Sequence, residues 1–126
     1  MTQNKDFSKF KWRVCKAGEA VNPILLSSGE EIEVEQFGIV GYLWKVKNKT
    51  KGHKDEYFYQ CPLVDSKEPG TGKFREWLRN VKKFVREEFD SSFAMCNITN
   101  QKLYKHFMEE DISVAVKDVL FKIQMK

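Results

Sequence analysis

The stretch KFREWLRNVKKFVREEF, from Lys73 to Phe89, decides the fold of this chain. At about 100° per residue, its apolar side chains fall on one arc of a helix and its basic side chains on a second, narrower arc. The apolar arc predicts a face that packs against a core. The basic arc, here called the basic ridge, consists of Arg75, Arg79, Lys82 and Arg86, with Lys83 at its edge. A ridge of this kind faces solvent or a partner, and it is the strongest functional clue in the sequence.

The residues before this helix have the period of two that is typical of half-buried strands. Strands are expected over 9–15, 31–35, 42–47 and 56–61, and further helices from about 97–100 to Met108 and from Asp111 or Ser113 to about Ile123. Strands followed by helices indicate the α+β class. The sequence therefore predicts a single domain over residues 1–126. Its N-terminal half forms an antiparallel sheet of about four or five strands, or a small partly open β-barrel, packed against about three C-terminal helices.

The C-terminal segment leaves two interpretations open. Alternation of Val114 and Val116 is compatible with a strand, whereas Val116, Val119, Leu120 and Ile123 fall at helical spacing. The second pattern covers more of the segment and favours a helix.

Composition and charge limit the function classes. With 41% hydrophobic and 32% charged residues the chain has the composition of a globular protein, and its net charge of +4 is too small to identify a nucleic-acid binder by itself. No apolar stretch approaches the roughly 18 residues of a membrane helix, and the polar N-terminus lacks the apolar core of a signal peptide. We therefore expect an intracellular protein, cytoplasmic or nuclear, with no membrane partner.

The chain lacks a recognisable catalytic or metal motif. Its three cysteines are widely spaced, and neither His53 nor His106 lies at metal-ligand spacing with another His or Cys. The glycines at 70 and 72 precede a helix, but the lysine after them is followed by Phe74, which breaks the phosphate-loop pattern. The sequence therefore predicts no metal, no cofactor and no enzymatic activity.

A second basic element is a lysine-rich hairpin beside aromatic residues. It consists of Lys45, Lys47, Lys49, Lys51 and Lys54, with Tyr57 and Tyr59 as candidates for exposed rings. Basic loops beside aromatic strands are typical of sheets that hold single-stranded nucleic acid, where lysines contact phosphates and rings stack on bases.

Acidic residues offer a competing interpretation for the strands but not for the ridge. Glu31, Glu33 and Glu35 are expected to pair with lysines of the hairpin or with basic residues of the first strand. The glutamates within the helix lie off the basic ridge, so the ridge is expected to remain largely unpaired.

Two functions follow from these patterns. The first is a non-catalytic nucleic-acid-binding module that contacts the phosphates of DNA or RNA, single-stranded or duplex, with the ridge and the hairpin. The alternative is a protein-interaction module, such as a complex subunit, adaptor or small inhibitor, that docks its ridge on an acidic protein.

Overall fold

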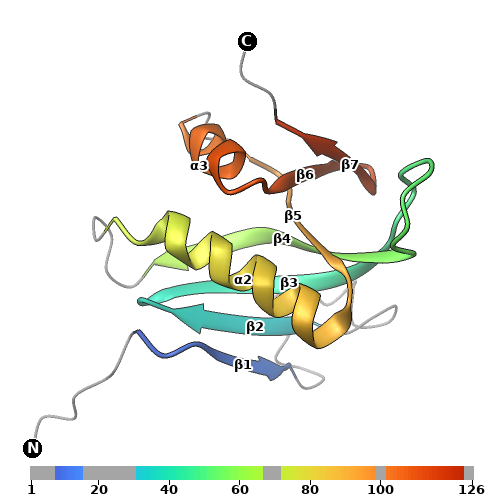
Figure 1. The fold of residues 1–126 in the computed structure, drawn as a ribbon. Helices are drawn as coiled ribbons and strands as arrows, with labels where there is room; N and C mark the ends of the chain where they lie inside the picture. The colour runs from blue at the N-terminus through green and yellow to red at the C-terminus, as the bar shows by residue number, and fades with distance from the viewer. Residues whose placement is uncertain (1–7, 16–30, 67–71, 99–101, 124–126) are drawn as a thin grey trace, which may run out of the picture.

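The computed structural model of the chain describes residues 8–15, 31–66, 72–98 and 102–123, and it shows an α+β fold. Its elements follow in the order β1 (Lys11–Val14), β2 (Glu31–Gln36), β3 (Ile39–Lys47), β4 (Tyr57–Ser66), α2 (Phe74–Phe89), β5 (Ser92–Met95), α3 (Leu103–Glu109), β6 (Ser113–Val116) and β7 (Val119–Lys122). These strands form one sheet whose spatial order equals the chain order, from β1 at one edge to β7 at the other (Figure 1).

The sheet is mixed. Strands β1 to β4 form an antiparallel meander, and β6 and β7 are antiparallel. Helix α2 connects β4 to β5 and helix α3 connects β5 to β6, and each of these strand pairs is parallel. Parallel neighbours need such crossovers, so the two helices lie over the sheet and their side chains share one core cluster.

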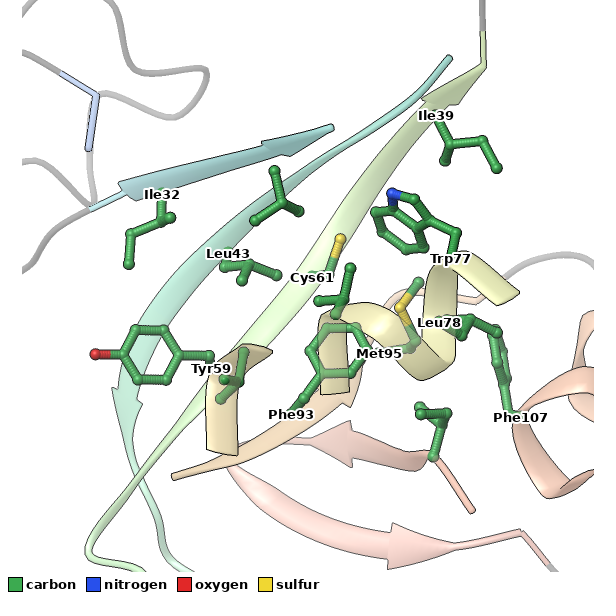
Figure 2. Close-up of a cluster of buried hydrophobic side chains, with 14 residues drawn as sticks. Ile32, Ile39, Leu43, Tyr59, Cys61, Trp77, Leu78, Phe93, Met95 and Phe107 are labelled. Atoms are coloured by element: carbon green, nitrogen blue, oxygen red, sulfur yellow. The ribbon is translucent and has the colours of Figure 1, made fainter. Parts of the chain in front are cut away.

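The main core lies between α2 and the sheet. Helix α2 buries Trp77, Leu78, Val81 and Val85, which recur at helical spacing. Figure 2 shows the Trp77 ring extending from the helix toward Cys61 of β4. The indole of Trp77 lies against the backbone of Gly41, because a Cβ at that glycine would come within 2.6 Å of Trp77 Cζ2.

A smaller cluster covers the other face of the sheet at its C-terminal end. Phe58, Ala94, Cys96 and Ala115 are buried there, with Val46 and Leu120 packed against them. Phe58 and Ala94 alternate with residues of the main core, as expected for strands covered on both faces. Burial raises the pKa of the Cys96 thiol to about 11, so the thiolate form is disfavoured at neutral pH.

The long connection between β3 and β4 folds onto the far end of the sheet. The amide of Lys49 donates to the carbonyl of Asp118 at 2.9 Å, and the amide of Leu120 donates to the Thr50 hydroxyl at 2.7 Å. Asn48 closes the connection internally, since its side chain donates to the carbonyl of Asp55 and accepts from the amide of Thr50. These contacts hold the start of the connection, just after β3, against the C-terminal hairpin formed by β6 and β7.

Two expectations about the fold were wrong. The predicted third helix is the β6–β7 hairpin, so the described residues contain two helices. Lys117 and Asp118 connect the two strands with positive φ angles of 50° and 66°, which is the two-residue turn that antiparallel strands prefer. The expectation that the C-terminal half contains only helices was also wrong, because it adds β5, β6 and β7 to the sheet through two parallel pairings. The N-terminal half does form the expected antiparallel sheet, β1 to β4.

Candidate functional site

The basic ridge lies on the side of α2 that faces the end of α3 and the connection before β4. With the apolar face of α2 fixed on the sheet, the helical spacing leaves the ridge side chains partly exposed along that side. The ridge is therefore presented on a rigid element, and what it contacts decides what it can bind.

The first turn of the ridge is paired with acidic residues at the end of α3. Arg75 Nη1 lies 2.8 Å from Glu109 Oε2. Arg79 donates to both oxygens of Glu110, with its Nε at 2.7 Å and its Nη2 at 3.0 Å. This bidentate contact lowers the pKa of Glu110 and raises the pKa of Arg79. The two arginines thus fasten α2 to α3.

Lys82 binds the C-terminal end of α3. That end is closed by two backbone hydrogen bonds, from the amide of Asp111 to the carbonyl of Met108 and from the amide of Ile112 to the carbonyl of Phe107, with Asp111 in the left-handed region at φ 53°. The ammonium of Lys82 donates to the carbonyl of Asp111 at 2.8 Å. The same ammonium lies 3.5 Å from the carbonyl of Glu110, the C-cap of α3, where the partial negative charge of the helix end favours a cation.

Arg86 binds the connection before β4. Its Nη2 lies 2.8 Å from Asp55 Oδ2, and its Nη1 lies 3.4 Å from Asp55 Oδ1. The Ser92 hydroxyl donates to the same carboxylate at 2.6 Å. Chiefly because Arg86 donates to it, the pKa of Asp55 lies below its ordinary value, and the pKa of Arg86 is raised.

The expectation that the ridge lacks acidic partners was therefore wrong. Glu110 binds Arg79, and Asp55 binds Arg86. In each pair the two residues are 31 positions apart in the chain. Spacing within one helix cannot reveal such partners. The ridge therefore has a structural role, since it joins α2 to the end of α3 and to the connection before β4.

The strand charges are closer to expectation. Arg13 of β1 pairs with Glu33 of β2 at 3.2 Å, as the cross-strand interpretation predicted. Glu31 is instead buried and accepts a hydrogen bond from the Trp44 indole at 2.8 Å. Its role is structural.

Some lysines of the lysine-rich hairpin contact other side chains and others do not. Lys49 pairs with Asp118 at 3.5 Å, and Lys45 Nζ lies 4.6 Å from the centroid of the Tyr57 ring. The remaining hairpin lysines, Lys47, Lys51 and Lys54, are exposed and have no ion-pair partner in the part of the chain that the structure describes.

The two tyrosines differ, and one expectation about them was wrong. Tyr57 is 38% exposed, as predicted. Tyr59 is only 4% exposed because its ring stacks on Phe89 of α2 with centroids 4.6 Å apart. Tyr59 belongs to the core and is unavailable for stacking on a ligand.

A cleft of about 690 Å³ brings part of the ridge and part of the hairpin together. We call it the basic cleft. Its cationic lining consists of Lys54, Arg79, Lys82, Lys83, Arg86 and Lys122. Its acidic lining is smaller and consists of Glu87, Glu110 and Asp111. Cations from the β3–β4 connection, α2 and β7 therefore converge on one concave surface, which favours anions.

The other predicted site residues do not line this cleft. They are Arg75 of the ridge, the hairpin residues Lys45, Lys47, Lys49 and Lys51, and the two tyrosines. Sequence reasoning missed Lys122 and Ser92 of the cleft. The apolar spacing predicts a helix around Lys122, whereas the β6–β7 turn places this residue in β7 at the sheet edge.

The described residues give no sign of a metal centre or a membrane span. Among them, no three His, Cys, Asp or Glu side chains are grouped to hold a metal ion, and neither helix has both the length and the apolar character needed to cross a bilayer. Comparisons of the chain with protein-family models, with curated proteins and with solved structures give no significant match.

Proposed function

We propose that this protein is a non-catalytic nucleic-acid-binding module whose basic cleft holds backbone phosphates. The observation that carries this proposal is the convergence of six cationic side chains from three separate segments on one cleft that has only three carboxylates in its lining. Repeated cations along a concave surface are suited to successive phosphates.

Five of the six cations of the cleft divide into two kinds, and the sixth, Lys82, binds the C-terminal end of α3. Arg79 and Arg86 are held in place by the mostly buried carboxylates of Glu110 and Asp55. Lys83 and Lys122 are largely exposed and have only long ion pairs, at 3.9 Å and 3.7 Å. Together with Lys54, these two lysines are the side chains that we assign to phosphate contact.

A second part of the surface supports binding of single strands. Lys45 lies opposite Tyr59 in the β3–β4 register, and Tyr59 stacks on Phe89, the last residue of α2. The next residue pair on that face, Lys47 and Tyr57, is therefore beyond the end of the helix and exposed. In the proposal, the Tyr57 ring stacks on a base while the neighbouring lysines contact phosphates.

The experiment measures binding with and without the exposed lysines of the cleft. Fluorescence polarisation with labelled single-stranded DNA, single-stranded RNA and duplex DNA is run at about 50 and 200 mM salt. We expect micromolar or tighter binding that weakens steeply with salt. The variant Lys54→Glu/Lys83→Glu/Lys122→Glu should lose most of this binding and flatten the salt dependence.

A matched control separates the cleft from net charge. The variant Lys9→Glu/Lys105→Glu/Lys117→Glu changes the net charge equally at exposed positions outside the cleft. It should lose much less affinity. The proposal is wrong if the wild type fails to bind at about 50 mM salt, or if both triple variants lose affinity equally.

The alternative function is a protein-interaction module that docks on an acidic protein. The observation that favours it is that Val116 and Phe121 of the β6–β7 hairpin are each 54% exposed. Large exposed apolar side chains on one hairpin are typical of a protein interface. Capture from nuclease-treated lysate would support it if one acidic protein is retained by the wild type and lost by Val116→Ser/Phe121→Ser.

A further inference from the structure

The carboxylates that contact the cations of the basic cleft differ sharply in exposure. The side chains of Glu110 and Asp55 are 8% and 10% exposed, and each makes a bidentate contact with an arginine. The side chain of Asp111 is 66% exposed. Glu110 and Asp55 are therefore built into the fold, whereas the Asp111 carboxylate remains largely in solvent.

Asp111 lies between two lysines of the cleft lining, one from α2 and one from β7. Its Oδ2 is 3.5 Å from Lys82 Nζ of α2, and its Oδ1 is 3.7 Å from Lys122 Nζ of β7. Lys82 does not depend on this carboxylate for its position, because its shorter contact is the 2.8 Å hydrogen bond to the Asp111 carbonyl. The two ammonium groups thus flank one anionic group, which Asp111 supplies.

We propose that Lys82 and Lys122 form a phosphate subsite of the basic cleft, and that the Asp111 carboxylate competes with a ligand phosphate for the two ammonium groups. This inference rests on the proposed function, since it names one contact and one internal competitor within that site. Exposed ion pairs at such distances contribute little free energy, so exchanging this carboxylate for a phosphate carries a small cost. The competitor keeps the cleft selective for ligands that offer several phosphates at once.

The backbone at Asp111 allows a clean test. Asp111 holds a left-handed conformation with φ 53° at the end of α3, and asparagine tolerates that conformation. Asp111→Asn therefore removes the charge while keeping the size of the side chain and the helix end. Asp118→Asn is a matched control, because Asp118 also has positive φ, is also ion-paired and lies outside the basic cleft.

The expected result is a gain in affinity for Asp111→Asn alone. At about 50 mM salt, this variant should bind labelled single-stranded DNA about two- to fivefold more tightly than the wild type, whereas Asp118→Asn should match the wild type. Adding Lys122→Met to Asp111→Asn should abolish the gain. Where the wild type binds the oligonucleotide, the inference is overturned if both Asp→Asn variants behave alike, if Asp111→Asn weakens binding, or if the gain survives Lys122→Met.

A second readout separates this inference from the proposed function. Inorganic phosphate is titrated into each variant while amide NMR signals of residues 110–123 are followed. Tighter phosphate binding by Asp111→Asn, with shifts at Lys122, supports the subsite even if no oligonucleotide binds, in which case only the proposed function fails. If the protein binds the oligonucleotide and Asp111→Asn leaves the affinity unchanged, the proposed function stands. The inference that the Asp111 carboxylate competes with phosphate is then wrong.

Discussion

The guanidinium of Arg86 holds the carboxylate of Asp55 across 31 residues of sequence, with contacts of 2.8 and 3.4 Å. Ser92, the first residue of β5, donates to the same carboxylate. One carboxylate therefore joins the last turns of α2, the connection before β4 and the start of β5. This junction forms one wall of the basic cleft, so stability and binding are coupled there.

Removing the cation of this junction should destabilise the fold. Arg86→Met leaves the mostly buried Asp55 carboxylate with the Ser92 hydroxyl and without its charged partner. Because the arginine is partly open to solvent, we expect a loss of about 1–2 kcal/mol rather than the larger cost of breaking a fully buried pair. Urea unfolding measures it. Lys83→Met, three residues away and exposed, should stay within about 0.5 kcal/mol of the wild type.

Acid should weaken the same junction. The pKa of Asp55 is lowered in the folded protein, so near and below about pH 4 the unfolded chain takes up a proton that the folded protein binds less readily. The stabilisation is complete at neutral pH and is lost as pH falls through the lowered pKa. The gap in urea midpoint between the wild type and Asp55→Asn should therefore narrow from pH 7 towards about pH 3. If the difference in urea midpoint between the wild type and Asp55→Asn does not change with pH, the pKa of Asp55 is not lowered by folding.

Gly41 is expected to tolerate no side chain. A Cβ there would lie 2.6 Å from Trp77 Cζ2 and 3.2 Å from Cys61 Sγ. Gly41→Ala should cost about 1–3 kcal/mol through overpacking, as measured by urea unfolding. Trp77→Phe removes the ring atoms that would clash, so Gly41→Ala should cost less in that background. Additive costs in the double variant would mean that the indole does not set the constraint.

The two tyrosines of β4 should separate binding from stability. Tyr57→Ala should weaken single-stranded DNA binding by about 1–3 kcal/mol, because it removes the proposed stacking ring, and it should leave the urea midpoint nearly unchanged. Tyr59→Ala removes a buried ring stacked on Phe89, so it should lower the urea midpoint instead. Equal loss of binding in duplex and single-stranded DNA for Tyr57→Ala would argue against stacking.

The sequence was informative wherever a local pattern carried the answer. Trp77, Leu78 and Val81 recur at the helical period, so the helix and its buried face followed directly. The cross-strand pair of Arg13 and Glu33 was also predictable, because alternating charges on neighbouring strands meet.

The remainder depended on contacts between distant segments. No local pattern shows that Glu110 and Asp55 reach the ridge, because α3 and the β3–β4 connection must first be placed against α2. The C-terminal hairpin was missed for a different reason. Apolar spacing around Val119 and Leu120 matched a helix, and the turn at Lys117 and Asp118 lacks the asparagine and glycine that usually mark such a turn.

That turn supplies a test whose sign distinguishes a hairpin from a helix. Lys117 and Asp118 have positive φ angles of 50° and 66°, a conformation that Asn-Gly adopts with less strain. Lys117→Asn/Asp118→Gly should therefore stabilise the protein by about 0.5–1 kcal/mol in urea unfolding, less the small contribution of the exposed pair between Asp118 and Lys49. In a helix the same change would destabilise by a similar amount or more, because glycine and asparagine are poor helix formers. A fall in the urea midpoint would thus contradict the hairpin, and with it the position of Lys122 in the basic cleft.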